Sequence, residues 1–174
     1  EHPLERLRSV ELVPFRAAIA AGVATVMTAH VLMPALDEKR PATLSRRIVF
    51  DLLRDELNFE GVILSDDLEM KAIASTYAVP SAAVLAIAAG CDGILICSGD
   101  HGTQSAALEA LIYAVESGEL PPARVDDALK RQQRAKERFL TAAAAFRPLH
   151  GSALRQRLGG DEHRAIADEM ARFQ

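Results

Sequence analysis

The sequence predicts an α/β fold in which parallel strands alternate with helices. Three short apolar segments, at residues 23–29, 61–65 and 93–97, have the length and the branched side chains of buried strands. Stretches of helical length separate them, and such connections join parallel strands by right-handed crossovers. In a chain of 174 residues, this repeat fits either a small open sheet or part of a (β/α)8 barrel, which needs about 250 residues when complete.

The helices follow from apolar residues that recur at spacings of three and four. In the first helix Val10, Val13 and Ala17 share one face, and Gly22 is placed to end it. Two prolines make the loop over residues 30–43 irregular. Helices are expected over residues 9–21, 45–57, 81–89, 105–117, 124–140 and 162–173, with a helical turn over 69–75 and a polar loop over 98–104.

The composition is that of a globular protein and narrows the class of partner. Apolar residues make up 49 % and aromatic residues 5 %, which favours helices packed closely on a sheet over a β-sandwich. The net charge of −4 gives no electrostatic reason to expect nucleic acid. No segment reaches the roughly 18 apolar residues of a membrane helix. We therefore expect neither a nucleic-acid nor a membrane partner.

The two cysteines flank the third predicted strand. An extended chain places Cys91 and Cys97 roughly 20 Å apart, which is too far for a disulfide. The first three residues lack the basic and apolar regions of a signal peptide. We expect two reduced, buried thiols in a cytoplasmic protein.

Polar residues stand at the carboxyl end of every predicted strand. Parallel strands end at the same edge of their sheet, and ligands bind at that edge in α/β proteins. The convergence of these residues therefore predicts a ligand site. They are Thr28 and His30, then Ser65, Asp66 and Asp67, and then Ser98 and Asp100.

The adjacent acids Asp66 and Asp67 are the most informative of these residues. A buried strand holds them rigidly, and side-chain alternation predicts that they point to opposite sides. One acid could then face a substrate while the other serves the scaffold. The alternative is that both are structural, as a helix N-cap and as a partner of Lys71.

The chain resembles the bacterial β-N-acetylhexosaminidases of glycoside hydrolase family 3. The resemblance covers nearly the whole chain, and its most specific part is the run Ser65-Asp66-Asp67-Leu68-Glu69-Met70. Family members that act on glucosides usually carry an aromatic residue in place of Asp67. The matching segments lie at residues 11–15, 26–30, 41–45, 61–70, 89–92 and 124–139.

The resemblance implies a retaining hydrolysis that releases terminal β-linked N-acetylglucosamine, without a cofactor or a metal. Asp66 matches the nucleophile of the family, which forms a covalent glycosyl-enzyme intermediate. His30 and Met70 are candidate substrate-binding residues. The alternatives are a hydrogen-bonded structural role for His30 and a packing role for Met70. Asp67 is expected to be a capping or supporting acid and not a catalytic one. The expected partner is an N-acetylglucosaminide such as a peptidoglycan fragment.

The resemblance also implies that this chain is the carboxyl-terminal part of a (β/α)8 barrel, with about three β/α units. The family's acid/base group is a His paired with an Asp in an earlier loop, and that loop is not in this sequence. We therefore expect the acid/base loop to lie outside this chain. Residues 1–146 are expected to form the partial catalytic domain, and residues 147–174 a helical tail or linker toward a possible second domain.

Two other classes of function stay open. One is an Mg²⁺-dependent phosphoryl-transfer domain that uses Asp66 and Asp67, although no G-x-x-x-x-G-K motif is present. The other is a non-catalytic scaffold fragment. A three-strand piece of a barrel would also expose two sheet edges and one sheet face, which predicts self-association. Val26, Ile63 and Ile94 are candidates for that exposed face, with their strand neighbours as the alternative.

Overall fold

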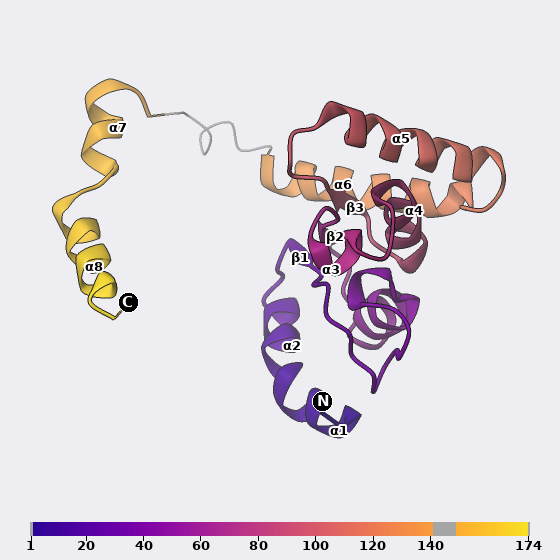
Figure 1. Cartoon of the computed structure of the whole chain (residues 1–174). Coiled ribbons are helices and arrows are strands. Elements are labelled where there is room, and N and C mark those ends of the chain that lie inside the picture. Colours follow the sequence, from indigo (N-terminus) through magenta and orange to yellow (C-terminus); the bar gives the residue numbers. More distant parts are fainter. Residues whose placement is uncertain (1, 141–148, 174) are drawn as a thin grey trace. The chain divides into compact units, whose positions relative to one another are not determined.

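The computed structural model describes residues 2–140 and 149–173. The chain divides into two compact units, which separate after Arg138 (Figure 1). The domain boundary predicted between residues 146 and 147 lies outside the described residues. The first unit contains the sheet and all the candidate site residues.

The sheet has three parallel strands in the order β1-β2-β3, as predicted. The strands are β1 (Thr25–Met27), β2 (Val62–Asp67) and β3 (Gly93–Leu95). β1 and β3 are shorter than predicted. β2 is longer, so that Asp66 and Asp67 are its last two residues and do not follow it.

Each helix predicted in the first unit is present with different ends, and two short helices that were not predicted lie at Leu4–Arg6 and Ala42–Leu44. The expected first helix is divided, because the Leu12 amide bonds five residues back to the Leu7 carbonyl and a second helix begins at Val13. The bounds are α1 Leu4–Arg6, η1 Leu7–Glu11, α2 Val13–Ala20, η2 Ala42–Leu44, η3 Arg47–Glu56, α3 Lys71–Ala74, α4 Val79–Ala89, α5 His101–Glu116 and α6 Pro122–Leu140.

The polar loop predicted over residues 98–104 is wrong in its second half, because α5 begins at His101. The Asp100 carboxylate accepts hydrogen bonds from the amides of Gly102 and Thr103, at 3.2 and 3.0 Å. Two of the amides at the helix start are thereby satisfied, which allows the helix to begin there.

Helices η3 and α4 pack on one face of the sheet. Ile63 is fully buried in the core together with Val49 of η3 and Ala83 of α4, and Val26 and Ile94 pack against the same core. Ile63, Val26 and Ile94 were the candidates for the exposed face, and that assignment is wrong. Their strand neighbours are exposed only on β1, where Thr25 is exposed and Met27 is 56 % exposed, whereas on β2 Val62 is buried and Leu64 is half-buried.

The two cysteines differ in environment. Cys91 is buried as predicted, and burial raises the pKa of its thiol to about 12. Cys97 is exposed, which contradicts the prediction that both thiols are buried. The reason is that β3 ends at Leu95, so Cys97 lies in the loop beyond the sheet.

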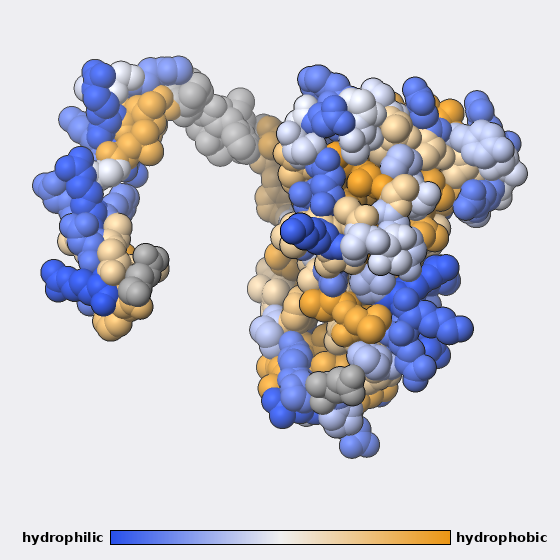
Figure 2. Space-filling model, viewed as in Figure 1, coloured by the Kyte–Doolittle hydropathy of each residue, from blue (hydrophilic) through white to orange (hydrophobic). Residues whose placement is uncertain are grey.

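The second unit contains α7 (Gly151–Arg157), which was not predicted, and α8 (Asp161–Ala171), which was. Hydrophobic residues gather on one side of this unit and hydrophilic residues on the other (Figure 2). Exposed apolar side chains of this unit include Leu154, Leu158, Ile166 and Met170. No helix among the described residues is long and apolar enough to cross a membrane.

A buried carboxylate joins four elements at the amino ends of the strands. Asp92, whose side chain is fully buried, accepts hydrogen bonds from Arg54 of η3 at 2.7 Å and from Arg124 of α6 at 2.5 Å. The same carboxylate accepts the amide of Ile63 in β2 at 2.9 Å. Burial lowers the pKa of Arg54, and the neighbouring Asp92 carboxylate opposes this shift.

We predict that Asp92→Ala destabilises the first unit by about 3–5 kcal/mol, because two buried guanidinium groups lose their counter-charge. Urea unfolding followed by circular dichroism measures the loss. The matched control is Asp126→Ala, since Asp126 is an exposed carboxylate of α6 and such surface changes shift stability by about 0.5 kcal/mol or less. Equal stability of the two variants would contradict the prediction.

Candidate active site

The strand end that carries Asp66 is a β-bulge. Between the register pairs Leu64↔Gly93 and Asp67↔Leu95, β2 advances by one residue more than β3. The Ser65 hydroxyl fills the gap, since its Oγ accepts the Leu95 amide at 2.9 Å. A bulge interrupts the alternation of side chains and redirects them. The predicted opposite directions of Asp66 and Asp67 rest on an alternation that does not hold here.

The Asp67 carboxylate holds two backbone amides in the loops beyond β2 and β3. Its Oδ1 atom accepts the amide of Glu69 at 3.1 Å and that of Cys97 at 3.3 Å. The next helix, α3, has Met70 at its N-cap without a side-chain cap. The alternative in which the acid pair caps that helix is therefore wrong, whereas the scaffold role predicted for Asp67 matches its contacts.

Asp66 is half-buried, and its carboxylate is oriented by the neighbouring peptide. The Oδ1 atom accepts the Asp67 amide at 2.8 Å. Among the described residues, none donates a hydrogen bond to the other oxygen, Oδ2. One carboxylate oxygen is therefore held and the other is available to a ligand.

The carboxyl ends of the strands converge, as predicted. The Nε2 atom of His30, beyond β1, donates to the Asp67 carbonyl at 2.7 Å. The Glu69 carboxylate accepts the amide of Ser98, beyond β3, at 2.7 Å. His30, Asp66 and Ser98 thus lie at one edge of the sheet. Glu69, which sequence reasoning did not select, links two of the strand ends.

His30 uses both ring nitrogens within the protein. Nε2 bonds the Asp67 carbonyl, and Nδ1 lies 2.9 Å from the Oγ1 atom of Thr43. Thr43 is fully buried, and its hydroxyl lies 2.8 Å from that of Thr28. These contacts match the hydrogen-bonded alternative for His30, which is half-buried.

Met70 lies three residues beyond the end of β2 and is 45 % exposed. This partial exposure is compatible with both roles predicted for Met70, packing and contact with a substrate.

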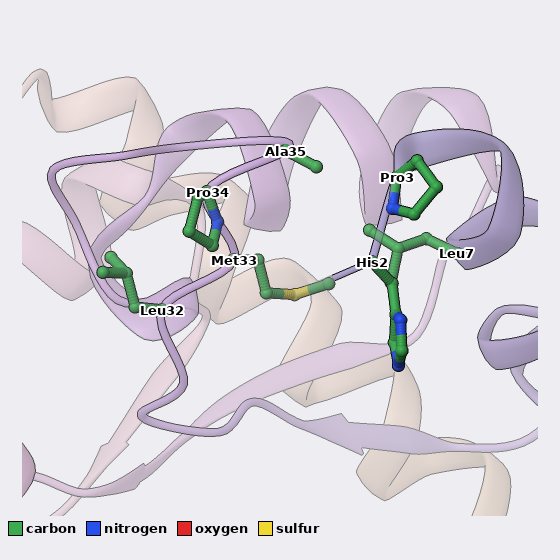
Figure 3. Close-up of a pocket in the computed structure, with 7 residues that line it drawn as sticks. All are labelled: His2, Pro3, Leu7, Leu32, Met33, Pro34 and Ala35. Atoms are coloured by element: carbon green, nitrogen blue, oxygen red, sulfur yellow. The ribbon is translucent and has the colours of Figure 1, made fainter.

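A separate pocket of about 450 Å³ lies between the beginning of the chain and the loop after β1 (Figure 3). Its lining is mostly apolar, and Asp66 is not part of it. The lining residues are His2, Pro3, Leu7, Leu32, Met33, Pro34 and Ala35. The candidate acid lies instead at the open edge of the sheet.

The acids do not form a metal site. In the described part of the chain, no group of three or more His, Cys, Asp or Glu side chains is arranged to hold a metal ion. Asp67 and Glu69 are occupied by backbone amides. The arrangement therefore does not favour the phosphoryl-transfer hypothesis, which requires Asp66 and Asp67 to share a cation.

Comparison with known proteins gives consistent matches. Residues 1–135 match the N-terminal domain of glycosyl hydrolase family 3. A β-hexosaminidase of Stenotrophomonas maltophilia is 47 % identical over 94 residues, which are 54 % of this chain and 28 % of that protein. A β-hexosaminidase of Pseudomonas aeruginosa is 38 % identical over 146 residues, which are 83 % of this chain and 43 % of that protein.

The solved structures agree. A glycoside hydrolase family 3 β-N-acetylglucosaminidase from Paenibacillus is similar with a TM-score of 0.81 and 48 % identity, over 87 % of this chain and 29 % of that one. The β-N-acetylglucosaminidase from Thermotoga maritima has a TM-score of 0.72 and 32 % identity, over 78 % of this chain and 30 % of that one. The chain spans less than half the length of these relatives.

We predict that Asp67→Ala costs about 1–2 kcal/mol of stability, because two amides lose a charged acceptor. Asp67→Asn keeps a carbonyl oxygen in place of Oδ1 and should cost less. Urea unfolding measures both losses, and hydrogen exchange at the Cys97 amide locates them. Equal losses in the two variants, with unchanged exchange at Cys97, would contradict the role of the Asp67 carboxylate as an acceptor for these amides.

Proposed function

The chain belongs to glycosyl hydrolase family 3, and from this premise we propose that the protein containing it is a retaining glycoside hydrolase. The proposed reaction releases terminal β-linked N-acetylglucosamine. The hexosaminidases and N-acetylglucosaminidases among its relatives support this substrate class. Fragments of peptidoglycan, which contain this sugar, are the substrates that we propose.

The observation that carries the proposal is the setting of Asp66. A nucleophilic carboxylate must be ionised, rigidly held and open on one side. Asp66 stands on a bulged strand end at the carboxyl edge of a parallel sheet, with Oδ1 bound to an amide and Oδ2 unbound among the described residues. Active sites of (β/α)8 barrels form at this edge.

In the proposed mechanism, Oδ2 of Asp66 attacks the anomeric carbon while the bond to the leaving oxygen breaks. A general acid protonates that oxygen, and the same group, now a base, takes a proton from the water that cleaves the glycosyl-enzyme ester. We propose that this acid/base group comes from a loop outside this chain. Met70 and the ring face of His30 are proposed to flank the sugar.

The sheet is proposed to be the carboxyl-terminal part of a (β/α)8 barrel. Such a barrel places helices outside the strands and fills its interior with side chains from the inner face. The face that bears Ile63 packs against helices, and the face that bears Met27 does not share that core. Met27 would then be an interior residue of the complete barrel.

We predict that Asp66→Ala abolishes turnover in a longer chain that carries residues 1–135 together with the acid/base loop. A chimera with a family relative provides such a chain. A fluorinated mechanism-based N-acetylglucosaminide, followed by peptide mapping, should label Asp66. The chain of 174 residues alone should be about 10²–10⁴-fold less active, because it lacks the acid/base group.

The control is Asp67→Asn, which keeps the fold and leaves Asp66 in place. It should retain measurable turnover of a chromogenic N-acetylglucosaminide, unaffected by EDTA. A label on a residue other than Asp66, or full activity of Asp66→Ala, would refute the assignment.

We further propose that this chain self-associates on its own, because β1 and β3 are edge strands and Met27 of β1 is an exposed apolar side chain. Light scattering after size exclusion should show dimers or larger species. Met27→Lys should shift them toward the monomer, whereas Tyr113→Lys, on the exposed surface of α5, should not. A monodisperse wild-type monomer would contradict the proposal.

A further inference from the structure

We propose that His30 is a positioning residue for Asp66 and acts through the backbone of Asp67. The inference rests on the proposed function, because it concerns the alignment of the nucleophile. It assigns to His30 a task separate from contact with the sugar.

The orientation of the Asp66 carboxylate depends on the backbone of Asp67. The Asp66 carboxylate is held by the Asp67 amide at 2.8 Å. Any rotation of the backbone at Asp67 therefore turns the carboxylate that must face the anomeric carbon. The Asp67 carbonyl accepts from His30 Nε2 at 2.7 Å and from the Met70 amide at 3.1 Å, so His30 restrains this rotation from the side of β1.

His30 replaces a missing backbone contact between the ends of β1 and β2. The register of β1 and β2 ends at Met27↔Leu64, and the last backbone bond between them runs from the Thr28 amide to the Leu64 carbonyl. Beyond this point the imidazole reaches across to the end of β2. On the side of β3, the Leu68 amide bonds the Leu95 carbonyl at 3.0 Å. The strand end is thus held from both sides.

The imidazole ring of His30 is itself held by hydrogen bonds. A carbonyl oxygen only accepts, so Nε2 carries the proton, and in the neutral ring Nδ1 accepts from the Thr43 hydroxyl. Thr43 then has no further proton to give, and Thr28 donates to it. Since Thr43 is fully buried, this relay anchors the tautomer and the angle of the imidazole.

Two substitutions separate the two ring nitrogens. His30→Gln can place an amide N–H near the position of Nε2 and keep the bond to Asp67. His30→Asn places its amide near the position of Nδ1 and loses that bond. Thr43→Val removes the relay and keeps the shape of the side chain.

The first experiment uses the chain itself and does not depend on catalysis. Hydrogen exchange of the Asp67 amide reports its bond to Asp66, and exchange of the Ile63 amide, which bonds to Asp92, reports the stability of the core. His30→Asn should speed exchange at Asp67 and leave exchange at Ile63 unchanged. His30→Gln should return exchange at Asp67 to the slow rate of the wild type. Thr43→Val should give an intermediate rate.

The second experiment measures kinetics in the longer chain that carries the acid/base loop. His30→Asn and His30→Gln both lose the ring face and should share any rise in KM, whereas kcat should fall about 10²-fold in His30→Asn, since a misplaced nucleophile slows the chemical step. His30→Gln should recover most of that loss. A rise in KM without a fall in kcat, or equal losses of kcat in His30→Gln and His30→Asn, would overturn the positioning role.

The two experiments also separate this inference from the proposed hydrolysis. A longer wild-type chain without turnover would refute the hydrolysis, and exchange at Asp67 would still decide whether His30 positions Asp66. Equal changes at Asp67 and Ile63 would reduce His30 to a general contributor to stability.

Discussion

The buried Asp92 carboxylate is the constraint on which the rest of the first unit depends. It stands just before β3 and binds a guanidinium group from η3, another from α6, and the amide of Ile63 in β2. Removing charges from water is costly unless partners compensate, so Asp92 favours the arrangement of these four elements in which all three partners reach it. This anchor lies at the amino ends of the strands, opposite the edge that carries Asp66. Stability and the candidate chemistry therefore occupy opposite edges of the sheet.

At the carboxyl ends of the strands, side chains make the hydrogen bonds that backbone groups make in the middle of the sheet. Ser65 Oγ accepts an amide of β3, Asp67 and Glu69 accept amides beyond it, and His30 donates to a carbonyl of β2. Beyond the last backbone bonds between the strands, polar side chains satisfy the remaining amide and carbonyl groups. Ordered polar groups near an acid are what a retaining glycosidase needs, because water must be excluded from some positions and admitted at others.

Much of this arrangement follows from local sequence signals. Buried strands, helix-ending glycines and polar residues after each strand are local features, and they lead to the correct strand order and to the convergence at one edge. The start of α5 was also accessible, since Asp100 precedes Thr103 in a capping spacing. Which side chains of β1 face the core could not be predicted from the sequence, because Val26 and Met27 are both apolar. Contacts between distant residues, such as Arg124 with Asp92, have no local signal either.

The bulge in β2 has a consequence for how this segment tolerates change. In a regular strand, the direction of a side chain follows from whether its position is odd or even. Here the direction of Asp66 also depends on the additional residue between the pairs Leu64↔Gly93 and Asp67↔Leu95. Losing one residue from this interval would bring a different side chain to the place of Asp66, although every remaining residue kept its identity. The segment is therefore more sensitive to insertions and deletions than to many substitutions, and sequence alignments across it need to preserve the residue count as well as the acids.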